Sequence, residues 1–287
     1  MRLSLLLTAS ILLLAIFSTP SVMAMSDQQY LLAMTAMHMR DAPVASPAAM
    51  QKPVQPVHGA DVVYATVNGK PVHGYLSEPV NGTGPLPGII VIHEWWGLND
   101  NIRSMADQLA GEGYAALAVD LYGGHAATTP QAAENLMKGV LAHTDAADSN
   151  LHQAYAYLHD TEHATRIGVI GWCFGGGWSL QTALMLPDKI DATVMYYGRP
   201  VDDVAALSKL KMPLIGFFGA EDKGFNPTVV HAFEAALKQA HVRAEIHIYP
   251  GAGHAFANPS GENYRPAAAT DAWRHTLAFF ARYLKGA

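Results

Sequence analysis

Short apolar runs alternate with amphipathic stretches along most of the chain, and this alternation predicts an α/β fold. Runs that are almost wholly apolar are typical of strands buried on both faces of a sheet. The strands predicted in this way are 88–93, 114–119, 167–170, 192–197, 214–218 and 244–249. Helical periodicity is expected over 102–112, 130–142, 147–160, 178–186, 228–240 and 267–284. We therefore predict a mostly parallel central sheet with helices on both faces.

A β-hairpin is predicted ahead of this alternating region. Two segments of alternating character, 62–67 and 72–76, flank the dipeptide Asn68-Gly69, which favours a tight turn between antiparallel strands. The folded domain is expected to cover residues 61–287, a length that is ordinary for a single domain of this architecture.

The first 24 residues have the pattern of a cleavable signal peptide. Arg2 precedes an apolar run over 3–17, and the small-residue site Val22-Met23-Ala24 follows. The run is shorter than the ~20 residues that span a bilayer, which disfavours the alternative of an uncleaved anchor. We expect export, most simply to the periplasm, with no stable membrane insertion after processing.

Residues 25–60 are expected to form a flexible lead-in. The segment is rich in proline and alanine, a composition typical of an extended tether. Its histidines, His38 and His58, have no spaced partner, whereas a metal site needs several convergent ligands. No metal site is therefore predicted.

Composition narrows the classes of function. The net charge of −6 leaves no basic patch for nucleic acid, and no dinucleotide, P-loop or zinc-protease motif occurs, so no cofactor is expected. A single cysteine excludes an internal disulfide framework in an exported protein. The sequence leaves the oligomeric state open.

The lone cysteine lies in a motif that is typical of a nucleophile elbow. An apolar strand enters Gly171-Trp-Cys-Phe-Gly175, and a helix-compatible run follows. Glycines at both ends of the motif suit a tight turn, and the N-terminus of the helix favours a thiolate at Cys173. The alternative is a small buried thiol in a Gly-rich turn.

Two later loops supply the other catalytic residue types. Asp222 follows the apolar strand 214–218, and His254 lies in a Gly-rich loop after strand 244–249. Glu221 is the alternative carboxylate. The order of nucleophile, acid and histidine matches the triad of α/β hydrolases. Cys173 would attack a carbonyl, His254 would move the proton, and Asp222 would orient the imidazole.

With these residues placed, the chain resembles the dienelactone hydrolase family, also called carboxymethylenebutenolidases. The resemblance covers about residues 61–285. It rests on four motifs in order, which are His93-Glu-Trp-Trp-Gly-Leu-Asn99 leading to 113–122, Gly171–Gly177, Gly219–Asp222 and Gly251–Phe256. It implies the α/β-hydrolase fold and hydrolysis of a small lactone or activated ester through a thioester.

The resemblance also implies roles for further residues. Glu94 matches a family glutamate that helps to activate the cysteine, and the backbone N–H groups of Trp95 and Phe174 would form the oxyanion hole. The residues expected to line the substrate pocket are Trp96, Tyr122, Phe256 and Asn258.

The chain departs from the family where relatives bind a substrate carboxylate with two arginines. One of these positions is Asn258, and no arginine occurs between Arg103 and Arg166, where the other would lie. An uncharged lactone or ester is therefore as plausible as a carboxylated dienelactone. Alternatives are a broad carboxylesterase, thioesterase or peptidase, a non-catalytic binding protein on the same fold, and a peroxide-reactive thiol protein.

Overall fold

A computed structural model describes residues 25–41 and 50–286, and the predicted signal peptide lies outside these residues. One eight-stranded sheet runs through the molecule in the order β1-β2-β4-β3-β5-β6-β7-β8. The strands are β1 (Val57–Val67), β2 (Lys70–Pro79), β3 (Gly88–Ile92), β4 (Ala115–Val119), β5 (Ile167–Trp172), β6 (Ala192–Tyr196), β7 (Leu214–Gly219) and β8 (Ala244–Tyr249). The helices are α1 (Asp27–His38), α2 (Asp100–Gly111), α3 (Pro130–Ala142), α4 (Thr144–Ala156), α5 (Phe174–Met185), α6 (Val204–Leu207), α7 (Pro227–Gln239) and α8 (Pro266–Phe280).

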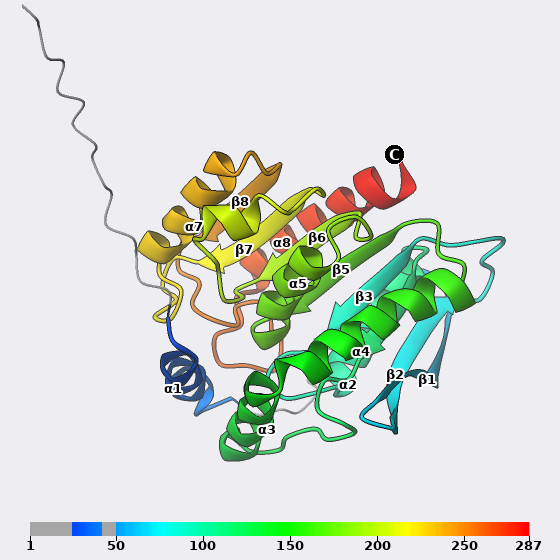
Figure 1. The fold of residues 1–287 in the computed structure, drawn as a ribbon, viewed down its shortest axis with the longest axis horizontal. Coiled ribbons are helices and arrows are strands. Elements are labelled where there is room, and N and C mark those ends of the chain that lie inside the picture. The colour runs from blue at the N-terminus through cyan, green and yellow to red at the C-terminus, as the bar shows by residue number, and fades with distance from the viewer. Residues whose placement is uncertain (1–24, 42–49, 287) are drawn as a thin grey trace, which may run out of the picture.

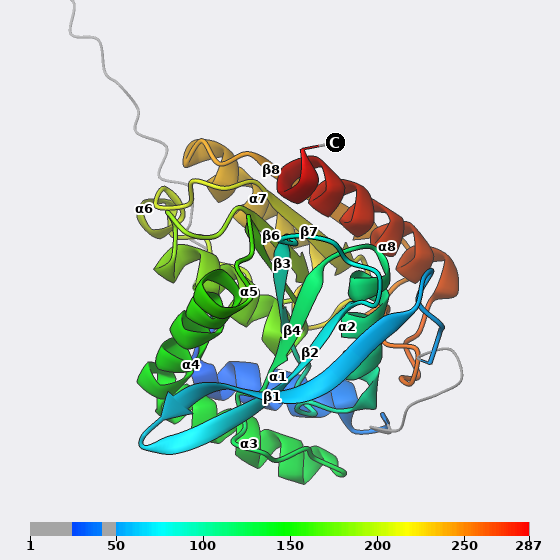
Figure 2. The same ribbon diagram turned by 90° about the vertical axis from the view of Figure 1, so that its right-hand side faces the viewer.

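The predicted α/β architecture is confirmed. Strands β3 to β8 pair in parallel, whereas β1 and β2 form an antiparallel hairpin that joins the sheet through β4. Every residue of β3, β4, β5, β6 and β7 is buried, as expected for strands covered on both faces. Helices α2 and α8 cover one face of the sheet, and α4 and α5 cover the other (Figure 2).

The hairpin forms where the turn sequence predicted it. Asn68 and Gly69 both have positive φ, 51° and 73°, and Val67 pairs with Lys70 across this two-residue turn. This conformation matches the twist of the flanking strands, and asparagine and glycine tolerate it best. The first strand begins at Val57, ahead of the expected domain boundary at residue 61.

Residues 27–38 correct the expectation of a flexible lead-in, because they form helix α1. Ser26 accepts a hydrogen bond from the backbone of Gln29, whose side chain accepts from the backbone N–H of Ser26, so the helix starts with a capping box. Tyr30 and Met34 are buried on one side of α1. The helix lies beside α3 at the carboxyl-terminal ends of the parallel strands (Figures 1 and 2). The sequence did not predict this short helix, because the proline-rich residues that follow it are typical of an extended tether.

Other differences are small. Helix α5 begins at Phe174 rather than at residue 178, because the elbow passes directly into the helix. The last predicted helix divides into α8 and a π-helical end over Ala281–Lys285. Within the described residues, none of the helices has the length and apolar character needed to cross a bilayer.

Candidate active site

Cys173 occupies the turn between β5 and α5 in a conformation that few side chains adopt. Its φ of 55° and ψ of −116° lie outside the broadly allowed regions. A Cβ at Gly171 would lie 2.1 Å from the carbonyl oxygen of Gly175, and a Cβ at Gly175 would lie 2.4 Å from that of Ile92. Only glycine fits at either place, so the glycines predicted for an elbow are required by backbone contacts.

Cys173, His254 and Asp222 lie together at the carboxyl-terminal ends of three strands. The Nε2 atom of His254 is 3.3 Å from Sγ of Cys173, and its Nδ1 is 2.7 Å from Oδ2 of Asp222. The other carboxylate oxygen, Oδ1, accepts hydrogen bonds from the backbone N–H groups of Gly224 and Phe225. All three residues are buried. This arrangement has the geometry of a Cys-His-Asp triad and favours Asp222 over Glu221, which is exposed.

The electrostatics favour a thiolate–imidazolium pair. Burial raises the pKa of the Cys173 thiol, but His254 and His38 outweigh it and lower that pKa to about 6. Burial lowers the pKa of His254, but Asp222 and Cys173 outweigh it and raise that pKa well above its usual range. The sulfur is therefore mostly ionised at neutral pH, which is the reactive form of cysteine.

Glu94 lies next to the triad in a hydrogen-bonded pocket. Its Oε2 accepts a hydrogen bond of 2.6 Å from the side-chain amide of Asn258, and its Oε1 accepts one of 3.4 Å from the hydroxyl of Tyr197. Burial and then the charge of Cys173 raise the pKa of Glu94 to about 8. The carboxyl group is therefore mostly protonated at neutral pH while the sulfur is ionised.

The preceding residue, His93, fixes the backbone from which Glu94 projects. The backbone N–H of Leu121 donates to Nε2 of His93, so the ring proton is on Nδ1, which donates to the carbonyl oxygen of Glu94. Burial lowers the pKa of His93, which keeps the ring neutral. The histidine thus ties the end of β3 to the loop after β4. Sequence reasoning gave it no such role.

Helix α1 brings two residues to the catalytic sulfur that sequence reasoning missed. The thioether Sδ of Met34 is 3.5 Å from Sγ of Cys173, and Nε2 of His38 is 3.4 Å from the same sulfur. The other nitrogen of His38, Nδ1, is 2.7 Å from Oδ2 of Asp41. Met34, His38 and Cys173 are all 0% exposed. Cys173 therefore lies between two histidine–aspartate pairs, one from the triad and one from the N-terminal segment.

His38 is held on several sides. Its ring stacks on Trp95 with 4.6 Å between centroids and meets the ring of His254 edge-on at 5.2 Å. Burial lowers the pKa of His38, but Cys173 and then Asp41 outweigh it and raise that pKa to about 9. No local spacing in the sequence links His38 to the sulfur, since Cys173 lies in the turn after β5 and His254 in the loop after β8.

The residues expected in the oxyanion hole and pocket surround this cluster. Phe174 is the first residue of α5, so its backbone N–H has no acceptor within the helix. Among these expected residues, the buried indole nitrogens of Trp95 and Trp96 and the buried hydroxyl of Tyr122 have no hydrogen-bond partner within the described part of the chain. The ring of Phe256, also expected to line the pocket, packs against the rings of Tyr197 and Tyr249.

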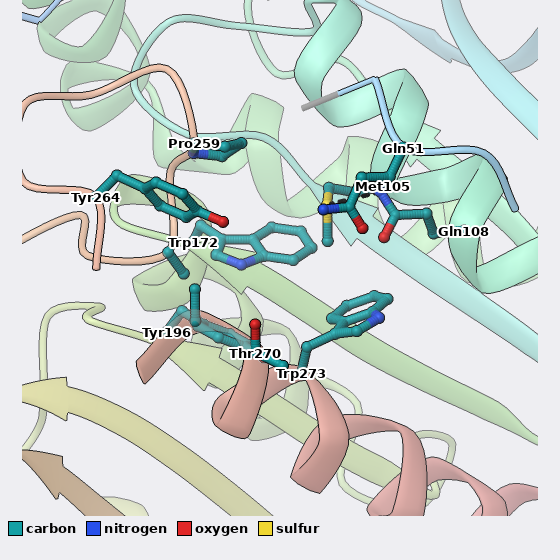
Figure 3. A pocket seen from close by; sticks show the side chains of 11 residues that line it. Gln51, Met105, Gln108, Trp172, Tyr196, Pro259, Tyr264, Thr270 and Trp273 are labelled. Atoms are coloured by element: carbon teal, nitrogen blue, oxygen red, sulfur yellow. Dashed lines mark hydrogen bonds between the residues drawn. The ribbon is translucent and has the colours of Figure 1, made fainter. Parts of the chain in front are cut away.

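A cavity of about 130 Å³ with aromatic rings in its lining opens between α2 and α8. The side chains of Trp172, Tyr264 and Trp273 lie around it (Figure 3). A smaller neighbouring cavity shares Met105 and Trp172 with it and is also lined by Glu94 and Asn258. The smaller cavity therefore borders Glu94, and the larger cavity adjoins it through the shared residues.

The chain is similar to known proteins both in sequence and in fold. The model of the Dienelactone hydrolase family matches residues 72–284. "Protein usf" of Aquifex pyrophilus is 35% identical over 224 residues, which cover 76% of this chain and 96% of that protein. A "Putative carboxymethylenebutenolidase" of Saccharolobus solfataricus is 30% identical over 260 residues, covering 78% and 98%. The crystal structure of a "Putative Dienelactone Hydrolase" from Klebsiella pneumoniae superposes with a TM-score of 0.72 at 28% identity, covering 80% of this chain and all of that one.

Proposed function

This chain belongs to the dienelactone hydrolase family, and we propose that it hydrolyses an uncharged lactone or activated ester with Cys173 as the nucleophile. The observation that carries the proposal is the contact of 3.3 Å between Sγ of Cys173 and Nε2 of His254, backed by Asp222. A thiolate suits activated esters, because the thioester that it forms is readily hydrolysed.

In the first half of the reaction, the thiolate of Cys173 attacks the carbonyl carbon and forms a C–S bond. The backbone N–H groups of Trp95 and Phe174 stabilise the oxyanion. Collapse breaks the C–O bond of the ester, and the leaving oxygen takes a proton from the imidazolium of His254. In the second half, His254 removes a proton from water, water attacks the thioester, and the C–S bond breaks to restore the thiolate.

Glu94 would assist the reaction in its protonated form. Its carboxyl group lies among Asn258, Tyr197 and the sulfur, and its pKa near 8 allows it to exchange a proton close to neutral pH. A neutral carboxylic acid avoids repulsion with the thiolate. We infer that Glu94 tunes the charge at the sulfur, in agreement with the role that the family resemblance implies.

The substrate class follows from what lines the site. The unpartnered donors on Trp95, Trp96 and Tyr122 suit neutral acceptor oxygens, and the aromatic rings of the cavity between α2 and α8 suit apolar groups. Asn258 stands where relatives have an arginine, and its side chain is engaged by Glu94. A substrate that carries no carboxylate is therefore favoured over a carboxylated dienelactone.

Substrate access requires a movement of α1. Cys173 has no exposed surface while Met34 and His38 contact its sulfur. We infer that α1 acts as a lid, which shifts to admit substrate and keeps water from the thioester when it returns.

The signal-peptide pattern of residues 1–24 supports export to the periplasm. Expression of the full chain in a Gram-negative host, followed by N-terminal sequencing of protein from the periplasmic fraction, tests this location. A chain that starts near residue 25 in that fraction is expected. Uncleaved protein in the cytosol would contradict export.

Hydrolysis of a dienelactone and of p-nitrophenyl acetate by the wild type and by Cys173→Ala tests the activity. We expect turnover of at least one ester and a loss of ~10³-fold or more in kcat in the variant, since removal of a triad nucleophile costs at least this much. Preference for the simple ester would support the uncharged substrate class. Absence of turnover by folded wild type with either ester, and with uncharged lactones, would favour the binding-protein alternative.

A further inference from the structure

Three side chains with soft or borderline ligand atoms converge where α1 meets the nucleophile elbow. The nitrogens of His38 and His254 and the sulfur of Cys173 lie within 4.8 Å of one another, and all three residues are buried. We propose that they bind a thiophilic metal ion, preferentially Cu(I), with the thioether of Met34 as a fourth ligand.

The distances fit a tetrahedral ion. The sulfur of Cys173 is 3.3 Å from Nε2 of His254 and 3.4 Å from Nε2 of His38. Metal–sulfur bonds of about 2.3 Å and metal–nitrogen bonds of about 2.0 Å at tetrahedral angles separate the ligand atoms by roughly 3.5 Å. The separations of the sulfur from both nitrogens therefore match those of a tetrahedral site, and all three ligand atoms lie within 4.8 Å of one another.

Both histidines are oriented as metal-binding histidines usually are. Nδ1 of His254 contacts the carboxylate of Asp222, and Nδ1 of His38 contacts that of Asp41, each at 2.7 Å. Such a carboxylate accepts a hydrogen bond from Nδ1–H and so directs Nε2 at the metal. The ion replaces the protons at the two Nε2 atoms, which pass to solvent, and the thiolate is its anionic ligand.

Met34 decides which metal fits best. Its Sδ is 3.5 Å from Sγ of Cys173, close enough for both sulfurs to share one ion, and the residue is fully buried. Thiolate and thioether ligands select Cu(I), and two histidines, one cysteine and a methionine form a copper ligand set. Zn²⁺ suits the cysteine and histidines but gains little from a thioether.

Such an ion would hold the enzyme closed. It would occupy the nucleophile and join α1 to the end of β5, so neither substrate nor an alkylating reagent would reach Cys173. The metal site does not depend on the proposed ester hydrolysis, because it is detected by binding rather than by turnover.

A second group of possible ligands serves as a control. Glu245, His247 and His275 lie together at the surface around β8 and α8, half-buried or exposed, and contain no sulfur. Metal bound by this surface group would remain bound in a variant that lacks Cys173. His275→Ala therefore separates surface binding from binding at the elbow.

The test is an anaerobic titration of the reduced, purified protein with Cu(I), in competition with a chromophoric Cu(I) chelator. We expect one ion per chain at high affinity, and protection of Cys173 from iodoacetamide.

The affinity for Cu(I) should fall by ~10²-fold or more in His38→Ala, at least the loss that follows removal of an outer-shell partner. His275→Ala should bind as the wild type does. Met34→Leu should weaken Cu(I) and leave Zn²⁺ affinity unchanged.

Equal Cu(I) affinity in His38→Ala and the wild type would overturn the proposal, as would failure of Cu(I) to protect the thiol of the wild type. Circular dichroism checks that His38→Ala is folded, and His38→Gln provides a second, polar replacement. Ester turnover without metal is measured separately. A wild-type protein that binds Cu(I) but does not hydrolyse esters would refute the proposed function alone. A wild-type protein that hydrolyses esters but does not bind Cu(I) would refute the metal site alone.

Discussion

The side-chain amide of Asn258 donates a hydrogen bond of 2.6 Å to Oε2 of Glu94, deep in the molecule beside the catalytic sulfur. The contact joins the loop that carries His254 to the end of β3. It also uses Asn258, where the family resemblance implies an arginine, to hold a carboxyl group of this chain. Burial raises the pKa of this carboxyl group from 4.5 to about 8.

Glu94→Gln should alter how stability depends on pH. Because the pKa of Glu94 is raised on folding, its contribution to stability is complete below about 4.5 and is lost as the pH rises through about 8. The variant keeps an acceptor for Asn258 but cannot ionise. Thermal unfolding of both proteins from pH 5 to pH 9 should show the Tm of the wild type falling more steeply. Parallel Tm curves would contradict the raised pKa.

The thiolate of Cys173 should form with an apparent pKa near 6. Alkylation by iodoacetamide should therefore speed up as the pH rises through 6 and level off above it, since only the thiolate reacts. In His254→Gln the midpoint should move upward, because the largest stabilising charge is gone. His152→Gln, an exposed histidine, is the matched control. The same midpoint in all three proteins would contradict the ion pair.

Arg199→Ala should loosen the lid. The guanidinium of Arg199 donates to Oδ1 of Asp27 at 2.6 Å and to the backbone carbonyl of Met25, and it lies over the ring of Tyr30 at 5.1 Å. These contacts tie the start of α1 to the loop after β6. Without them we expect Cys173 to be alkylated several-fold faster, since exposed ion pairs of this kind contribute about 1 kcal/mol or less.

Arg274→Ala is the control for the lid, because Arg274 pairs with Asp271 on the surface of α8, away from α1. It should leave the alkylation rate unchanged. Equal rates for Arg199→Ala and the wild type would indicate that the lid opens without breaking the contacts of Arg199.

Gly175→Ala should destabilise the elbow. Its Cβ would lie 2.4 Å from the carbonyl oxygens of Ile92 and His93, backbone atoms that cannot move aside. We expect a loss of about 1–3 kcal/mol in the free energy of unfolding, as for overpacking in a core. Gly139→Ala, in α3 with no atom within 4 Å, should gain about 0.5–1 kcal/mol. Urea denaturation measures both, and equal effects would refute the steric argument.

The sequence alone determined the fold and the three central residues. Apolar runs such as 214–218 are long enough and uniform enough to indicate buried strands, and Asn68-Gly69 fixes a turn by local conformational preference. Because Asp222 and His254 lie in the loops that follow β7 and β8, their positions at one edge of a parallel sheet followed from topology.

The tertiary structure decided what covers the catalytic sulfur. Met34 and His38 belong to a segment whose composition suggested a flexible tether, and its short helix gains its stability by packing beside α3 and over Cys173. Contacts between residues more than a hundred positions apart leave no periodicity or spacing in the sequence. The sequence thus determined the catalytic chemistry, whereas packing determined the access to it and the second histidine at the sulfur.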